Sequence, residues 1–405
     1  MNFDRIYLDH AATTPLRSEV AAVIAETSLH AGFNASSLHF EGRRARAAID
    51  DARDRVAKIL GAKRTEVVFT SGGTEADNLA LMGAGNGADS AARVVASAVE
   101  HHAVLAALER LQEDPTAPAF LHVDASGRVD PQEFEKALVP RPRCVSVMYA
   151  NNEVGTIQPI ARLARIAAAA SVPFHTDAVA AAAWLPLDTG KLGVDMMSLS
   201  AHKIGGPKGV GALFIREGLP LRPTMLGGGQ ESGRRSGTEN VAGIAGFALA
   251  LELAVAERAA AAATTGALRD RLETAIAAAV PGMTVNGAGA PRLPNISNIS
   301  FDGVEAGELL VALDLEGVAT SAGSACTSGS LQTSHVLAAM YPDSPGRSGI
   351  RFSLGARTTA GEIDRVIALL PPLVTRLREH SAYAAPLGGI GRLETHGARL
   401  WRQKL

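Results

Sequence analysis

Lys203 is the side chain best suited to covalent chemistry in the first two thirds of the sequence. It closes the segment Ser200-Ala201-His202-Lys203, which follows an apolar run at 196–199. A lysine in a partly desolvated pocket near other cationic groups has a lowered pKa and can form a Schiff base with a carbonyl compound. The alternative is a solvated surface lysine, which is the usual environment of this residue.

Cys326 is the candidate nucleophile. It lies within 320–330, a stretch of small polar residues and glycines that lacks the apolar neighbours of a buried cysteine. We therefore expect an exposed loop, and loops often carry function. Cys144, the other cysteine, lies within the apolar run 144–149 and is predicted to belong to the core. The alternative for Cys326 is an accidental exposed thiol.

Residues 71–75, Ser-Gly-Gly-Thr-Glu, form a glycine turn between the strand-like run 67–70 and helix-compatible sequence. The backbone at Gly73 and the hydroxyl of Thr74 are suited to a phosphate at a helix N-terminus. Taken alone, an ordinary turn with a threonine cap explains the same residues better.

Two further candidates follow the next strand-like runs. His101 comes after the run that begins at Val94, and an imidazole there can stack on a planar cofactor and move protons near neutral pH. Its neighbour His102 must point in a different direction, so at most one of the two is expected to face the site. Asn152 follows the run 144–149 and can hydrogen-bond a substituent of a heteroaromatic ring, or it can simply make a turn.

Asp177 ends the strand-like run 172–176. A carboxylate at this place can pair with a protonated ring nitrogen, as pyridoxal phosphate chemistry requires, or it can cap a helix. Ser200 and His202, next to Lys203, can contact a phosphate. Together these residues supply a phosphate cradle, a ring-nitrogen carboxylate and a lysine at strand ends, where ligands of open α/β sheets bind. With the stacking imidazole, they predict a pyridoxal phosphate site.

Three residues elsewhere complete the candidate site. Arg351, within 349–353, has a planar guanidinium that suits a substrate carboxylate, and Asn34 is expected to assist from the other end of the chain. Thr238 lies in a stretch rich in glycine and hydroxyl groups, which is predicted to reach a phosphate across a dimer interface.

The order of the elements predicts an α/β fold. Strand-like runs alternate with helical segments such as 160–170, which favours a mainly parallel sheet covered on both faces. The run 209–215 could be an added antiparallel strand, although its direction stays open. After a long helical stretch near 241–280, strand-like runs at 298–301 and 350–353 indicate a smaller α+β unit. We expect a large domain over 16–260, a small domain from 1–15 and 261–380, and a peripheral tail over 381–405.

The composition excludes several classes of function. The 405 residues are 47% hydrophobic and 20% charged with a net charge of −2, so no affinity for nucleic acid or an anionic membrane surface is expected. Two cysteines exclude a disulfide framework and a four-cysteine metal site, and no metal is expected. The N-terminus does not resemble a signal peptide, and charges interrupt the apolar stretch 241–263, so a cytoplasmic protein is predicted.

The chain resembles the cysteine desulfurases of the NifS/IscS type, in the class V aminotransferase branch of the fold-type I pyridoxal phosphate enzymes. The similarity runs from Tyr7-Leu8-Asp9-His10-Ala11-Ala12-Thr13-Thr14-Pro15 to about Leu354-Gly355. Its most specific parts are 200–203, 235–238 and 321–328. The resemblance implies a large domain with a mainly parallel, seven-stranded type of sheet and a smaller α+β C-terminal domain. The long cysteine loop is similar to that of the group with a flexible catalytic loop.

The resemblance also implies a role for each candidate. Lys203 holds the cofactor, Cys326 carries the persulfide, and His101 stacks on the ring and moves protons. Asp177 contacts the ring nitrogen, and Asn152 contacts the ring hydroxyl. The phosphate is held by Gly73, Thr74, Ser200 and His202, with Thr238 of a second subunit. Arg351 and Asn34 hold the carboxylate of L-cysteine. A homodimer is implied, with an iron–sulfur scaffold, a tRNA-thiolating enzyme or another carrier as sulfur acceptor.

Ala180 departs from the family pattern, which usually has a glutamine there that donates to the ring hydroxyl. Losing one neutral hydrogen bond costs roughly 1 kcal/mol, so cofactor binding should be weakened but not abolished. Two other functions stay open. One is a selenocysteine lyase or another pyridoxal phosphate C–S lyase, and the other is a non-catalytic sulfur-relay protein with decayed cofactor binding.

Overall fold

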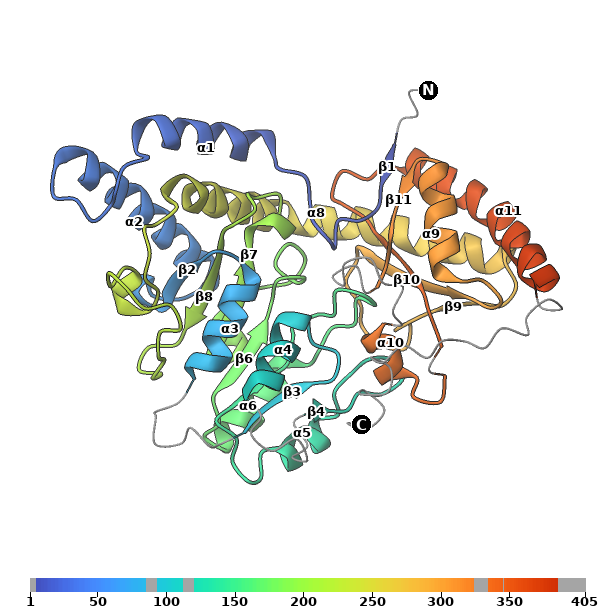
Figure 1. Ribbon diagram of the computed structural model, residues 1–405, viewed down its shortest axis with the longest axis horizontal. Coiled ribbons are helices and arrows are strands. Elements are labelled where there is room, and N and C mark those ends of the chain that lie inside the picture. The colour runs from blue at the N-terminus through green and yellow to red at the C-terminus, as the bar shows by residue number, and fades with distance from the viewer. Residues whose placement is uncertain (1–4, 85–92, 112–119, 324–333, 345, 385–405) are drawn as a thin grey trace.

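A computed structural model of the chain describes residues 5–84, 93–111, 120–323, 334–344 and 346–384 (Figure 1). Its centre is a seven-stranded sheet in the order β2-β8-β7-β6-β5-β3-β4. These strands are Val67–Thr70, Gly211–Ile215, Met196–Ser200, Phe174–Asp177, Cys144–Ser146, Val94–Ser97 and Phe120–Leu121. The neighbours from β7 to β4 are parallel, whereas β8 is antiparallel to both β2 and β7. The mainly parallel sheet is confirmed, and the added strand is antiparallel.

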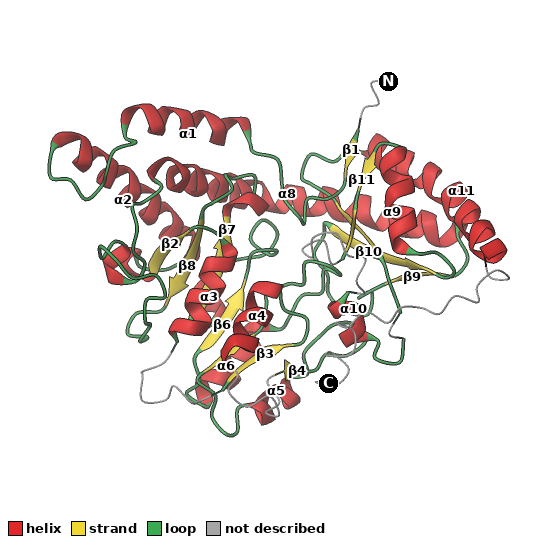
Figure 2. Cartoon of the chain, viewed as in Figure 1, coloured by secondary structure: helices red, strands yellow, loops and turns green. Residues whose placement is uncertain are grey.

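Both faces of the sheet are buried, because successive residues along a strand contribute to opposite cores. On β7, Met196 packs in one apolar cluster and Met197 in the other. On β8, Leu213 joins the first of these clusters while its neighbour Ala212 joins the second. Figure 2 shows helices on both sides of the sheet. The near-continuous apolar runs in the sequence follow from this double burial.

Helices of the large sheet fall on its two sides. One cluster contains residues of α3 (Gly73–Gly83) and α4 (His102–Leu111). The other contains residues of α2, α6 and the first half of α8, which span Phe40–Leu60, Ile160–Ala169 and Val241–Ala279. The remaining helices of this part are α1, α5 and α7, at Ser18–His30, Pro131–Ala137 and Thr189–Leu192, with 3-10 turns at Arg64–Glu66, Ala201–Lys203 and Glu231–Gly233.

A second core lies around a four-stranded antiparallel sheet in the order β12-β13-β10-β9. Its strands are Ser321–Ala322, Ile350–Ser353, Ile296–Phe301 and Met283–Val285. A separate parallel pair joins β1 to β11, so the start of the chain packs with its last third. That pair is Ile6–Tyr7 and Val318–Ala319, and helices α9 and α11, at Ala306–Leu315 and Ala360–Ala384, contribute to the second core. Helix α10, at His335–Met340, packs instead against Val99 and Val154.

Helix α8 connects the two cores. It is 39 residues long, and its buried residues run from Val241 to Ile276. Leu251 belongs to the core of the large sheet, and Leu272 belongs to the second core (Figure 1). The boundary expected near residue 260 therefore lies inside one continuous helix. None of the described helices is both long and apolar enough to cross a membrane.

Candidate active site

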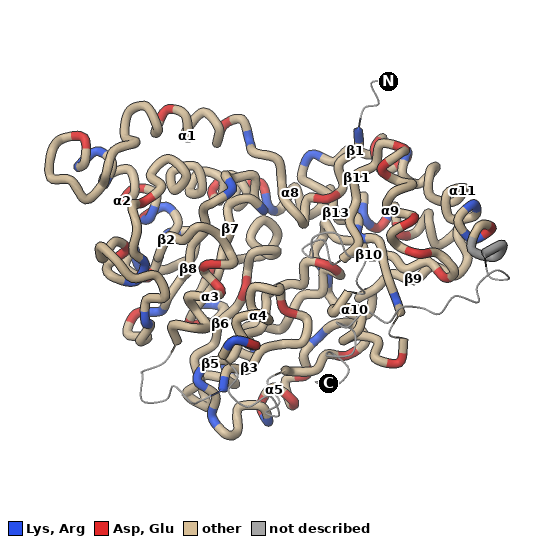
Figure 3. Tube along the Cα trace, viewed as in Figure 1, with Lys and Arg blue, Asp and Glu red and all other residues tan. Residues whose placement is uncertain are grey.

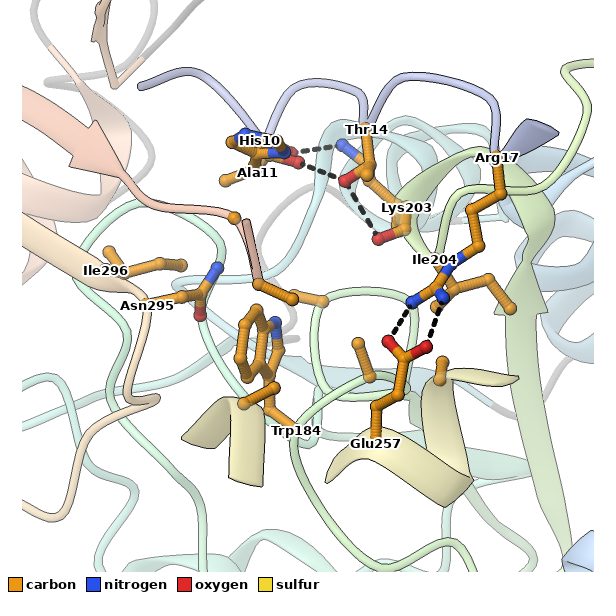
Figure 4. Close-up of a pocket in the computed structure, with 16 residues that line it drawn as sticks. His10, Ala11, Thr14, Arg17, Trp184, Lys203, Ile204, Glu257, Asn295 and Ile296 are labelled. Carbon is orange, nitrogen blue, oxygen red and sulfur yellow. Dashed lines mark hydrogen bonds and ion pairs between the residues drawn. The ribbon is translucent and has the colours of Figure 1, made fainter. Parts of the chain in front are cut away.

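Lys203 lies one short turn beyond the carboxyl end of β7. Its Nζ donates hydrogen bonds to the carbonyl oxygens of Ala12, at 2.8 Å, and of Ala11 (Figure 4). Thr14 adds two hydrogen bonds between this N-terminal segment and the lysine turn. Its backbone N–H donates to the carbonyl oxygen of His202 at 2.9 Å, and its hydroxyl donates to the carbonyl oxygen of Lys203 at 3.2 Å. The segment 10–14 therefore crosses over the lysine. No pattern in the sequence of this N-terminal segment indicates such a role.

Asp177 ends β6, the strand next to β7, and its side chain is almost fully buried. Its Oδ1 accepts a hydrogen bond from the backbone N–H of Val179 at 2.8 Å. Burial raises the pKa of Asp177 to about 6, while the Val179 hydrogen bond and the positive charge of Lys203 oppose that rise. The structure thus brings Asp177 and Lys203 together at one edge of the sheet, as neighbouring parallel strands require.

A buried polar group that was not predicted from the sequence lies next to Asp177. His175 is completely buried on β6, and its ring nitrogens contact the hydroxyls of Ser146 and Ser198, each at 2.9 Å. Its Nε2 also lies 3.6 Å from Oδ1 of Asp77, on α3. Burial lowers the pKa of His175 to about 3. Burial, followed by the charge of Asp177, raises the pKa of Asp77 well above its usual value, so the neutral carboxyl is favoured there.

His101 follows β3 and lies near Lys203. Its pKa is lowered to about 4, mainly by burial and next by the charge of Lys203, so the ring is neutral near pH 7. The backbone N–H of Ala103 donates to His101 Nδ1 at 3.1 Å, which fixes the ring. His102 is directed elsewhere, because its ring lies 4.7 Å from that of His335.

The predicted phosphate turn packs against the end of β7. Gly72 has a φ of +154°, and a Cβ at Gly73 would lie 2.8 Å from Val179 and 3.5 Å from Ser200. The turn can approach this closely because position 73 has no side chain. Thr74 is exposed at the start of α3, with free backbone donors around it. This geometry fits a phosphate held between the helix N-terminus and Ser200.

His202 borders the same region. Its Nδ1 lies 3.2 Å from the hydroxyl of Thr13, and burial lowers its pKa to about 4, assisted by the charge of Lys203. Glu75, one residue beyond Thr74, pairs with Arg235 at 2.8 Å. The Arg235 guanidinium thereby compensates a negative charge that would otherwise oppose a phosphate at this helix end.

Arg351 lies on β13 and is only 2% exposed. Its Nη2 pairs with Asp9 at 2.8 Å, and its Nη1 donates to the carbonyl oxygen of Asn152 at 3.0 Å. Asn152 thus contacts Arg351 through its backbone, in the loop that follows β5. Among the described residues Arg351 Nε has no hydrogen-bond partner, which leaves one buried donor for a bound carboxylate.

Two predicted site residues, Asn34 and Thr238, do not lie beside Arg351 within the same chain. Asn34 is exposed in the loop between α1 and α2, and this loop lies at the far left of the view, whereas β13 lies right of its centre (Figure 3). Thr238 is also exposed, and it lines a cavity of about 370 Å³ together with Ser71 and Arg235.

A second cavity, of about 620 Å³ with the open solvent in it included, lies beside Lys203 (Figure 4). Ala180, the position that departs from the family pattern, lines it together with Trp184 and the Arg17–Glu257 ion pair. The buried Oδ1 of Asn295, another lining residue, has no hydrogen-bond partner among the described residues. The short side chain at Ala180 therefore borders open space next to the lysine.

The two cysteines differ in how they can be assigned. Cys326 lies in 324–333, outside the described residues. Cys144 is fully buried in β5, and burial raises the pKa of its thiol to about 12. Cys144 therefore belongs to the core, as the sequence predicts, and is no nucleophile. Among the described residues, no three side chains are grouped as metal ligands.

A doubly covered sheet with a lysine after β7, a buried carboxyl ending β6 and a glycine turn at α3 is the architecture of fold-type I pyridoxal phosphate enzymes. The chain belongs to the class-V aminotransferase family, whose sequence model matches residues 6–366, and within it to the cysteine desulfurases of the NifS/IscS type.

The relatives are similar over nearly their whole length. Cysteine desulfurase IscS of Dictyoglomus turgidum is 44% identical over 380 residues, which are 93% of this chain and 96% of the relative. A solved NifS-like protein is 34% identical with a TM-score of 0.83, covering 94% of this chain and 100% of its own. The structure of SspA in complex with cysteine is 32% identical with a TM-score of 0.74, covering 87% and 100%.

Proposed function

We propose that this chain is a cysteine desulfurase, which converts L-cysteine into L-alanine and keeps the sulfur as a persulfide on Cys326. The proposal rests on the buried Asp177 carboxyl, whose pKa responds to Lys203 across the neighbouring strand, in a chain 44% identical to a cysteine desulfurase. Close relatives named for this activity and a related structure with bound cysteine support the choice of substrate.

The residues present fit pyridoxal phosphate. Lys203 would hold it covalently, Asp177 would face its ring nitrogen, and His101 would stack on the ring, with Asn152 near the ring hydroxyl. The phosphate would lie between Gly73 and Thr74 on α3 and Ser200 and His202 after β7. A Cβ at Gly73 would fill part of this cradle. When bound, the cofactor withdraws electrons from the substrate carbon that carries the amino group.

The chain's own groups then orient the substrate and move protons. The Arg351 guanidinium orients the substrate carboxylate, supported by its bonds to Asp9 and to the Asn152 carbonyl. Lys203 Nζ is the base for the proton on the substrate α-carbon. His101 is neutral near pH 7 and can accept or return a proton, since its pKa is lowered to about 4.

The sulfur transfer is balanced without an external oxidant. The Cys326 thiolate attacks the sulfur of the substrate, and a sulfur–sulfur bond forms as the bond between that sulfur and the substrate β-carbon breaks. The electron pair of the broken bond stays with the carbon. That carbon takes up a proton and becomes part of the methyl group of alanine. An acceptor nucleophile then attacks the outer sulfur of the persulfide, so the sulfur–sulfur bond breaks and the Cys326 thiolate is regenerated. An iron–sulfur scaffold and a tRNA-thiolating enzyme are the proposed classes of acceptor.

A second copy of the chain would bring the exposed candidates to the site. Around Asn34, four large apolar side chains are exposed, namely Leu29, Phe33, Leu38 and Phe40. An apolar surface of this kind is typical of an interface between proteins. We therefore propose a homodimer in which Asn34 and Thr238 serve the partner's site. A cytoplasmic location stays a prediction.

The cysteine variants test the proposal directly. Cys326→Ser should keep the bound chromophore yet stop alanine and persulfide formation from L-cysteine, whereas the buried control Cys144→Ser should keep both. Lys203→Ala should leave no pyridoxyl adduct after borohydride treatment, as read by mass spectrometry. Full alanine production by Cys326→Ser would refute the cysteine role, and a preference for selenocysteine or a larger thioether would identify a different lyase.

A further inference from the structure

We propose that Glu153 is a positioning residue for sulfur transfer, because its buried carboxylate holds both points at which the segment carrying Cys326 joins the described fold. This inference rests on the proposed desulfurase function. It concerns described residues, Gly323 before the segment and Ser334 after it. It adds a second role to the loop after β5, whose Asn152 carbonyl also accepts a hydrogen bond from Arg351.

The first contact is a hydrogen bond. The hydroxyl of Ser334 donates to Glu153 Oε2 at 2.5 Å, and both side chains are buried, with 6% and 3% of their surfaces exposed. Ser334 is also the N-cap of α10, since its Oγ accepts from the backbone N–H of Leu337 at 3.2 Å. The carboxylate is therefore fastened to the start of the first helix after the segment.

The second contact is steric. Gly323 follows β12, and a Cβ built on it would overlap Glu153 Oε2. The carboxylate thus occupies the space that a side chain at position 323 would need. Gly323 and Glu153 are matched in size, because any larger residue at 323 must displace the group that accepts the Ser334 hydrogen bond.

The loop that carries Glu153 is itself fixed. Oδ1 of Asn151 accepts hydrogen bonds from the backbone N–H groups of Glu153 and Val154, both at 2.9 Å. Asn298, on β10, donates to the carbonyl oxygen of Glu153 at 3.2 Å. Because its backbone is held in this way, the Glu153 side chain keeps a fixed position and can position the residues that it contacts.

The same loop holds the proposed substrate-binding group. Arg351 donates to the carbonyl oxygen of Asn152, the residue directly before Glu153. Arg351 and Asn298 are also paired in register between β13 and β10. Consecutive residues of one loop therefore hold the group that orients the substrate carboxylate and both edges of the segment that attacks the substrate sulfur. One loop therefore holds the proposed substrate-binding group and the two described residues that flank the segment of the nucleophile, and reaction rates depend on such placement.

Three single variants and one double variant test this role. Glu153→Ala removes the acceptor, Glu153→Gln keeps an acceptor for the Ser334 hydroxyl, and Gly323→Ala displaces the carboxylate from the other side. The double variant Glu153→Ala/Gly323→Ala removes the overlap. Glu133→Ala, at an exposed glutamate on α5, is the matched control.

Persulfide formation on Cys326 is measured by mass spectrometry in a single turnover, beside the change in cofactor absorbance when cysteine binds. Glu153→Ala and Gly323→Ala should slow persulfide formation by roughly tenfold or more, since small misplacements of reacting groups carry large rate costs. The absorbance change should keep its rate within about twofold, because that step does not involve Cys326. Glu153→Gln and Glu133→Ala should stay close to the parent, and the double variant should be no slower than Glu153→Ala alone.

A second readout does not depend on turnover. Without added cysteine, iodoacetamide should alkylate Cys326 about threefold faster in Glu153→Ala than in the parent or in Glu153→Gln, because an anchor of the segment is lost. Buried Cys144 serves as the internal reference. Persulfide formation and alkylation at the parent's rates in Glu153→Ala would overturn the proposal. A rate loss in the double variant equal to the product of the losses in the two single variants would overturn it as well. Absence of alanine from the parent protein would instead contradict the desulfurase function itself.

Discussion

Glu100 offers the sharpest test of the buried charges around the site. The side chain is completely buried after β3, where its Oε1 accepts a hydrogen bond from the backbone N–H of Met148 at 2.7 Å and another from the Ser97 hydroxyl. Its Oε2 has no hydrogen-bond partner among the described residues. Burial raises the pKa of Glu100 from 4.5 to about 8. The fold therefore prefers the protonated acid.

The sign and size of the effect follow from that shift. The pKa of Glu100 is higher in the folded state than in the unfolded state. The free energy of unfolding therefore falls as the pH rises from about 4.5, and it stops falling above about 8. At about 1.4 kcal/mol per pKa unit, the loss is about 2 kcal/mol at pH 6 and about 5 kcal/mol at pH 9. Glu100→Gln keeps the Oε1 acceptor and cannot ionise. Relative to the parent, the variant should gain about 3 kcal/mol between pH 6 and pH 9.

Urea unfolding of the purified protein, monitored by circular dichroism at the two pH values, measures this difference. The melting temperature provides a second measurement. The exposed residue Glu133, on α5, provides the control, because Glu133→Gln should show the pH dependence of the parent. Parallel stability curves for the parent and Glu100→Gln would refute the reasoning, since they would mean that Glu100 ionises in the fold near its ordinary pKa.

Three further predictions concern the site. Gly73→Ala should weaken cofactor binding by roughly tenfold in an absorbance titration, because its Cβ would lie 2.8 Å from Val179, and a second change, Val179→Ala, should restore part of the loss. Ala180→Gln should tighten cofactor binding by about fivefold in the same titration, as one restored hydrogen bond is worth roughly 1 kcal/mol. Arg351→Lys should raise the KM for cysteine by about tenfold with less change in kcat, because lysine cannot keep both bonds to Asp9 and the Asn152 carbonyl and still offer a planar fork.

The parts of the site that lie at strand ends could be predicted from the sequence. Asp177 and Lys203 follow runs that are buried on both faces of a parallel sheet, and such strands put their carboxyl ends at one edge. The local pattern therefore placed both residues together without any knowledge of the loops. Cys144 was also predictable, because an apolar run on a central strand buries whatever it contains.

The parts that depend on contacts between distant segments could not be predicted. Ala11 and Ala12 contact Lys203 through backbone carbonyls, and a carbonyl is common to every residue type, so the sequence carries no mark of it. Glu153 has no local signal either, because Ser334 follows it by 181 positions in the chain and Gly323 is almost as distant. His175 and Asp77 meet where strand β6 packs against helix α3. The alternation of apolar and polar residues along a strand does not reveal which helix residue lies opposite.

The buried titratable groups together determine which residue carries negative charge beside the lysine. Burial raises the pKa of Glu100 to about 8 and that of Asp77 well above its usual value, whereas the Val179 hydrogen bond and the Lys203 charge oppose the effect of burial at Asp177, whose pKa is about 6. The neighbouring imidazoles of His101 and His202 have pKa values lowered to about 4, so they add no positive charge there. Asp177 therefore ionises at a lower pH than Glu100. A protonated ring nitrogen placed against Asp177 would meet a full negative charge in a region of low dielectric constant, where that interaction is strongest.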